Sequence, residues 1–166
     1  MLKLLRYVAG VVAVLLVACG GGVSEEPIGD TLAPPPGQTV QLTLSHRLDG
    51  ATLWLEGDTD LPDGANVSYQ VTHEYAATEQ APEGMLLMES SHVAVSGGRY
   101  STSLSLEGWP AGDVRLFVAF PLPPQPEFIV ERFGGTGENL AGDNITTIGT
   151  FKSVEVVETI QFNPES

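Results

Sequence analysis

The residues of this chain that could carry out chemistry are few and scattered. The sequence holds no serine in a Gly-x-Ser-x-Gly context, and its single cysteine is Cys19. The segment 134–137 is Gly-Gly-Thr-Gly, but it lacks the Lys-Ser/Thr ending of a phosphate-binding loop. Glu127 and Glu131 would share one face of a helix, where two solvated carboxylates are the simpler interpretation. We therefore expect no catalytic residue, no cofactor and no metal, and predict that the protein is not an enzyme.

Three aspartates in one short stretch, Asp58, Asp60 and Asp63, raise the question of calcium binding. Calcium prefers several oxygen ligands from a short loop. Counted from Asp58, however, the EF-hand positions that need an oxygen ligand, a glycine and a glutamate hold Pro62, Asp63 and Tyr69. The segment Asp-Thr-Asp-Leu-Pro-Asp-Gly is also a dense turn signal. We favour an aspartate-rich turn.

The histidines and tryptophans complete the set of candidates. None of His46, His73 and His92 has a second ligand at metal-binding spacing. His73 alternates with apolar residues and is expected to be a hydrogen-bonded core or edge residue. Trp54 could anchor a ligand or partner if it is exposed. We favour its burial beneath a loop or a short helix.

The environment of Cys19 carries the most specific signal in the sequence. Lys3 and Arg6 precede an apolar run over 7–18, which is shorter than the roughly 20 residues that span a bilayer and suits a signal peptide. Leu16-Val17-Ala18-Cys19 resembles the lipobox of bacterial lipoproteins. The resemblance implies that Cys19 is lipidated at its sulfur and that the chain is cut after residue 18. Cleavage by the general signal peptidase and an uncleaved anchor over 4–18 are the alternatives.

A lipidated Cys19 would make membrane lipid the first partner of this protein. Two or more acyl chains give stable anchoring, whereas one gives marginal binding. Gly20 follows the cysteine where inner-membrane lipoproteins often carry aspartate, which favours the outer membrane if the cell has one. We expect an envelope protein that faces the periplasm or the exterior.

The charge of the mature chain limits its other partners. Without Lys3 and Arg6, five basic residues stand against 21 acidic ones, a formal net charge of −16. Nucleic-acid binding depends on basic patches, so it is excluded as a function. Anionic lipid would also repel the domain, which we expect to stand away from the bilayer. With Cys19 modified no thiol remains, so a hydrophobic core must supply the stability.

The remaining sequence predicts a tether followed by strands. Residues 19–37 are rich in glycine and proline and have no helix or strand period, which indicates a flexible tether. From residue 38 apolar and polar residues alternate, as in strands with one buried face. A helix is predicted near 126–133, and 163–166 is expected to be a loose tail. Strands are expected near 38–45, 51–57, 66–75, 85–95, 100–106, 114–120 and 148–162, the last with a break between Val156 and Ile160.

About seven strands with frequent turns and one short helix indicate an all-β fold. We expect an immunoglobulin-like antiparallel β-sandwich over 38–162, with a small barrel as the alternative. The segment 57–64, Gly-Asp-Thr-Asp-Leu-Pro-Asp-Gly, resembles the G-x-T-N-L-P-D-G turn of small secreted bacterial sandwich domains of unknown function. Those domains also carry a proline-led helix and a G-x-x-G segment before the last strand. The resemblance implies the fold and brings no activity.

These patterns predict a lipid-anchored binding or structural module of the cell envelope, with an envelope protein or ligand as its unknown partner. A hydrolase assembled from distant loops is the first alternative. A protease inhibitor that acts through the loop 76–84 is the second.

Overall fold

The computed structural model describes residues 37–165. The predicted signal peptide (1–18), Cys19 and nearly all of the predicted tether lie outside the described residues. No helix within residues 37–165 combines the length and the apolarity needed to cross a membrane. The described chain forms eight strands and one helix: β1 Ser45–Asp49, β2 Thr52–Asp58, β3 Asn66–His73, β4 Met88–Ala94, β5 Arg99–Ser105, β6 Gly112–Phe120, α1 Glu127–Phe133, β7 Ile145–Ile148 and β8 Phe151–Phe162.

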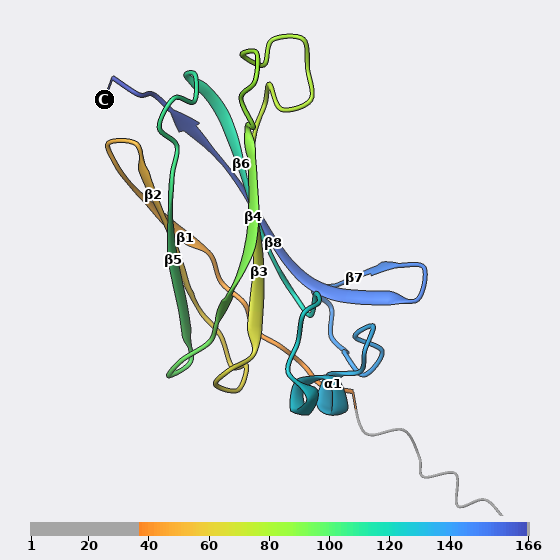
Figure 1. Cartoon of the computed structure of the whole chain (residues 1–166). Coiled ribbons are helices and arrows are strands. Elements are labelled where there is room, and N and C mark those ends of the chain that lie inside the picture. The colour runs from red at the N-terminus through yellow and green to blue at the C-terminus, as the bar shows by residue number, and fades with distance from the viewer. Residues whose placement is uncertain (1–36, 166) are drawn as a thin grey trace, which may run out of the picture. The chain divides into compact units, whose positions relative to one another are not determined.

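The strands form two antiparallel sheets, which confirms the predicted β-sandwich (Figure 1). One sheet has the order β1-β2-β5, and the other has the order β4-β3-β6-β8-β7. If β1, β2 and β5 are named A, B and E, then β3, β6 and β8 take the places of C, F and G. Immunoglobulin-like domains likewise keep A, B and E in one sheet and C, F and G in the other. β4 and β7 extend the second sheet at its two edges.

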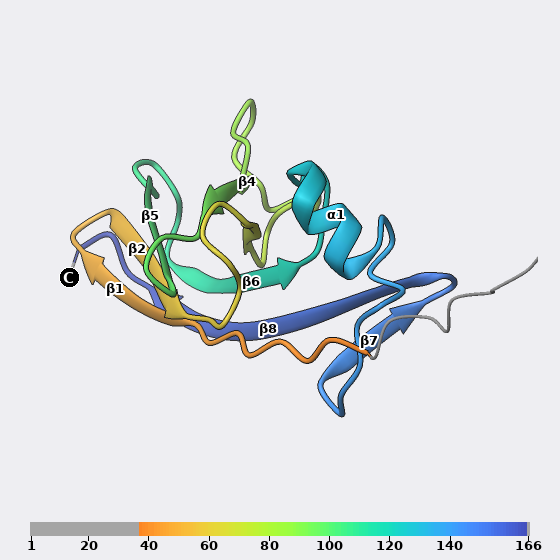
Figure 2. The same cartoon turned by 90° about the horizontal axis from the view of Figure 1, so that it is seen from below.

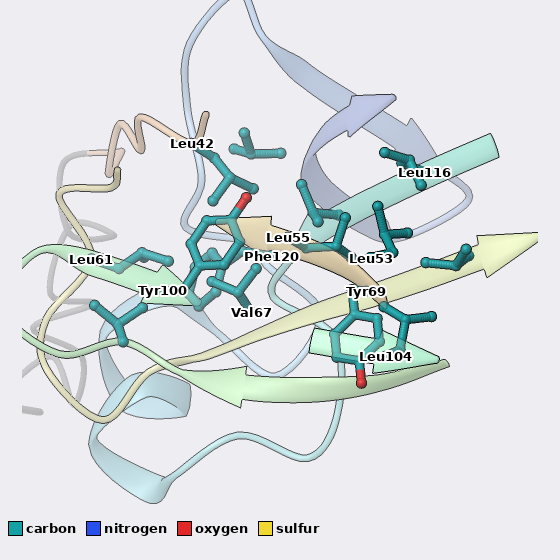
Figure 3. Close-up of a cluster of buried hydrophobic side chains, with 14 of the residues drawn as sticks. Leu42, Leu53, Leu55, Leu61, Val67, Tyr69, Tyr100, Leu104, Leu116 and Phe120 are labelled. Atoms are coloured by element: carbon teal, nitrogen blue, oxygen red, sulfur yellow. The ribbon is translucent and has the colours of Figure 1, made fainter. Parts of the chain in front are cut away.

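Alternation along the strands builds the core between the sheets. In β3 every second side chain from Val67 to His73 is buried, and the side chains between them are only partly covered. In β6 Val114, Leu116 and Val118 are buried on the inner face. Leucines of the three-stranded sheet meet these residues across the gap, as Figure 3 shows for Leu53, Leu55 and Leu104 around Val67, Tyr69 and Leu116. Burial of these apolar side chains is the main source of stability.

Helix α1 covers one end of this core, close to the end of β6 (Figure 2). Its buried residues are Ile129 and Phe133, and the Phe133 ring meets Phe120 edge-on with 5.0 Å between centroids. The chain enters the domain at the same end, where the Gln38 N–H donates to the Asn139 carbonyl at 2.7 Å. The predicted helix is therefore confirmed, and it seals the open end of the sandwich.

The predicted strand bounds are wrong at both ends of the domain, and the first strand is β1 Ser45–Asp49 rather than the segment 38–45. Val40 and Leu42 are buried as their alternation indicates, but the segment before β1 joins its neighbours only through isolated bridges at Gln38 and Leu42. The segment 148–162, predicted as one broken strand, holds the last residue of β7, the turn at residues 149–150 and the whole of β8, and β8 runs without a break. The apparent break came from Glu158, which takes an inward position of β8 at the rim of the core. There its carboxylate lies 3.2 Å from the ring of His46 in β1.

Candidate functional site

A hollow of about 240 Å³ lies on the outer face of the five-stranded sheet. Register brings polar side chains of two strands together on its floor, because Ser68 lies opposite His92 and Gln70 opposite Ser90. Ser90 and His92 are exposed, whereas Ser68 and Gln70 are partly covered. The Gln70 amide donates to the Thr72 hydroxyl at 2.9 Å, which orients its carbonyl group. The floor therefore offers hydroxyl, amide and imidazole groups to a ligand.

An aromatic ring adjoins this polar floor. Phe117 of β6 pairs with Gln70 on one side and with Val157 of β8 on the other, so all three lie on the same face of the sheet. The Arg115 guanidinium lies over the Phe117 ring at 5.5 Å, and Val157 is 49% exposed. This apolar strip beside hydrogen-bonding groups suits a ligand with both polar and apolar parts.

The segment 121–126 forms the wall of the hollow. Asn66 of β3 holds it through three hydrogen bonds: its N–H donates to the Gln125 side-chain oxygen at 3.1 Å, its side-chain amide to the Pro124 carbonyl at 2.7 Å, and its carbonyl accepts from the Gln125 amide at 2.7 Å. Leu122 and Pro123 then project beside the floor and also line a second hollow of about 240 Å³ next to Val130 of α1. Hydrogen bonds from β3 thus hold this wall in place, and two adjoining hollows share it.

The chemistry available in the first hollow is recognition through hydrogen bonds and apolar contact. Its lining residues include one histidine, His92, and one tyrosine, Tyr69, and no carboxylate, lysine or arginine. Within residues 37–165 no group of three or more His, Cys, Asp or Glu side chains could hold a metal ion.

The three aspartates considered for calcium make separate contacts in the turn between β2 and β3. Asp60 accepts the Gln41 N–H at 2.8 Å, and Asp63 accepts the Gly97 N–H at 2.7 Å. Asp58 forms an ion pair with Arg99 at 3.3 Å. Each carboxylate fixes a different backbone or side-chain group, which agrees with the interpretation of a turn.

His73 lies in the core, as its place in the alternating pattern indicates. It is 1% exposed, its Nε2 lies 3.1 Å from the Pro110 carbonyl, and its Nδ1 accepts the Tyr75 N–H at 3.0 Å. The contact with a carbonyl places the proton on Nε2, so both ring nitrogens are satisfied in the neutral form. The rings of Tyr75 and Trp109 pack against it. His73 is a structural residue that joins β3 to the turn before β6.

Two pKa shifts belong to structural contacts elsewhere in the domain. Burial, and to a lesser degree the Asp58 carboxylate, raises the pKa of Tyr100, whose hydroxyl donates to the Thr43 carbonyl. Backbone hydrogen bonds lower the pKa of Glu138, first from its own N–H and then from that of Thr136, and the Thr136 hydroxyl adds to them.

Trp54 is not buried beneath a loop or α1. It lies half-buried on the outer face of the three-stranded sheet, where the Arg47 guanidinium covers its ring at 5.1 Å. The long arginine side chain of the neighbouring strand provides the cover that a loop was expected to provide. Glu127 and Glu131 are both exposed on α1, as expected of a solvated face.

No family model matches the sequence, and no curated protein matches it. The chain is similar in structure to wild-type OgpA from Akkermansia muciniphila, with a TM-score of 0.39 and 12% sequence identity over 80% of this chain. The match covers 30% of the OgpA chain and carries no argument about function.

Proposed function

We propose that this protein is a lipid-anchored binding module of the bacterial cell envelope. The lipobox-like segment ending in Cys19 supports the anchor, and the glycine- and proline-rich stretch after it supports a tether. The hollow on the outer face of the five-stranded sheet carries the binding part of the proposal. It joins hydrogen-bonding side chains to an aromatic ring and lies on a sheet face that the core does not need.

The anchor is tested by metabolic labelling with radioactive palmitate. We expect label in the wild-type protein, none in Cys19→Ala, and a mature chain whose first residue is residue 19. A mature chain that begins elsewhere and carries no fatty acid would make the protein a secreted domain and end this part of the proposal.

The binding surface is tested by photocrosslinking in intact cells. A photoreactive amino acid replaces Ser90, which lines the hollow, or Ser103, which is exposed on the outer face of the other sheet. We expect a defined crosslinked product from position 90 and none from position 103. Equal products from both positions, or none from either, would contradict a binding role for this face.

A further inference from the structure

Strand β4 is an exposed edge. Six of its seven residues are exposed, and Val93 is partly covered. Within the described residues β3 is the one strand that pairs with β4, so β4 forms an edge of the five-stranded sheet. Edge strands are usually shortened, bulged or protected by lysine or proline, because their free backbone groups can pair with another chain. The edge strand β7 has four residues, whereas β4 has seven and contains no lysine, proline or glycine. β4 therefore lacks most of the usual protection, and Glu89 is its one charged residue.

The register shows which backbone groups of β4 point away from the sheet. Just beyond its two ends, the Val95 N–H donates to the Ala65 carbonyl at 2.8 Å and the His73 N–H donates to the Leu87 carbonyl at 3.0 Å. Both pairs continue the β3–β4 register, and hydrogen-bonded pairs alternate along an antiparallel ladder. The odd-numbered residues of β4 therefore bond to β3. The N–H and C=O groups that point outward belong to Met88, Ser90, His92 and Ala94.

Hollows accompany this row of free backbone groups. Ser90 and His92 line the polar hollow described above. At the start of β4, Leu86 and Met88 line an apolar hollow of about 260 Å³, and Leu86 is 75% exposed. Strand addition uses both features, because backbone pairing gives affinity and side-chain pockets give specificity.

Charge distinguishes between the possible occupants of this edge. The mature chain has a net charge of −16, so pairing β4 with a second copy would bring two strongly acidic domains together. The charged residue of β4 itself is Glu89, and the loop that leads to the strand carries Glu79 and Glu83. These charges favour a cationic partner.

We propose that β4 pairs with an extended, basic segment of another polypeptide, which adds a sixth strand to the five-stranded sheet. This inference rests on the proposed binding function and specifies its partner.

Amide hydrogen exchange measured by NMR tests the pairing on the full mature protein in detergent micelles. The probe is a ten-residue peptide that alternates lysine with threonine or valine, and the control peptide has glutamate in place of lysine. In the free protein the amides of Ser90 and His92 should exchange fast and those of Ser91 and Val93 slowly. The lysine peptide should slow exchange at Ser90 and His92 at least tenfold, and the glutamate peptide should not.

A pair of variants at one position separates backbone pairing from side-chain contact. His92→Pro removes an outward N–H, which an edge strand tolerates, whereas His92→Ala keeps the N–H and removes the side chain. We expect His92→Pro to weaken peptide binding at least tenfold and His92→Ala to weaken it by a smaller factor, because His92→Ala removes only the imidazole contact and keeps the backbone pairing. The wild-type exchange measurement decides the matter even if His92→Pro does not fold.

Three results would overturn the proposal. The first is unchanged exchange at Ser90 and His92 with saturating lysine peptide, and the second is equal binding of the two peptides. The third is protection that rises with protein concentration in the absence of peptide, which would assign the edge to self-pairing. Because acylation of Cys19 is measured separately, failure of the anchor and failure of the strand pairing can be told apart.

Discussion

Tyr100→Phe should destabilise the domain at neutral pH. The Tyr100 side chain is 2% exposed, and its hydroxyl donates to the carbonyl of Thr43 in the segment before β1. The substitution keeps the ring in the core and removes one buried hydrogen bond, which contributes about 1 kcal/mol to the free energy of unfolding. For a domain of this size that loss lowers the melting temperature by roughly 3–4 °C.

At alkaline pH Tyr100→Phe should no longer destabilise the domain relative to wild type. Burial, assisted by the Asp58 carboxylate, raises the pKa of Tyr100 in the folded state. Above pH ~10 an unfolded tyrosine releases its proton while folded Tyr100 keeps it, so the folded state binds more protons. The stabilisation is complete below pH ~10 and falls above it by at most about 1.4 kcal/mol per pH unit. By pH 11 the gap of about 1 kcal/mol between the two proteins should have closed or reversed.

Urea unfolding followed by tryptophan fluorescence measures both effects, because Trp109 is buried in the folded domain. The quantity to compare is the difference in free energy of unfolding between wild type and Tyr100→Phe at pH 7 and at pH 11. A difference that stays constant would refute the reasoning, since it would mean that Tyr100 titrates alike in both states. The pH dependence of wild type alone does not isolate Tyr100, because an acidic chain also gains charge repulsion at high pH.

Three further substitutions test the remaining structural contacts. Phe133→Ala should lower the free energy of unfolding in urea by about 3–5 kcal/mol, because it removes the buried ring with which α1 covers the end of the core. Gly57→Ala should prevent folding or lower stability by more than about 2 kcal/mol in the same assay, because a Cβ atom there would clash with the Thr43 carbonyl oxygen. Glu138 has a lowered pKa in the folded state, owing first to its own N–H and then to Thr136, so its stabilisation is present above the unfolded pKa and is lost as pH falls. Glu138→Gln should flatten the acid side of a plot of melting temperature against pH, and an unchanged slope would contradict this.

Much of the fold could be predicted from the sequence because alternation is a local property. The residues from Val67 to His73 show the period of two that burial of one strand face requires, and the structure buries that face. The helix Glu127–Phe133 could be placed because proline precedes it and glycine follows it. The last strand was misjudged because Glu158 occupies an inward position, and only the approach of His46 from the other sheet explains a carboxylate there.

The candidate binding surface could not be predicted, because register between strands creates it. Alternation along β3 puts Ser68 and Gln70 on the face away from the core, but it does not show which residues lie opposite them. His92 and Ser90 come from a segment 20 or more residues away, and Phe117 from one further still. For the same reason the cover of Trp54 was misjudged, since Arg47 lies beside it only once β1 and β2 have paired.

The residues that stabilise this domain and the residues offered for binding form separate sets. The core, the end sealed by α1 and the buried contacts of His73 and Tyr100 account for the stability that a chain without disulfides needs. The side chains of Ser90 and His92 are exposed and outside the core. A binding surface that the fold does not require can change without loss of stability. Substitutions along β4 should therefore alter binding while leaving the melting temperature nearly unchanged, whereas core substitutions should reduce both together.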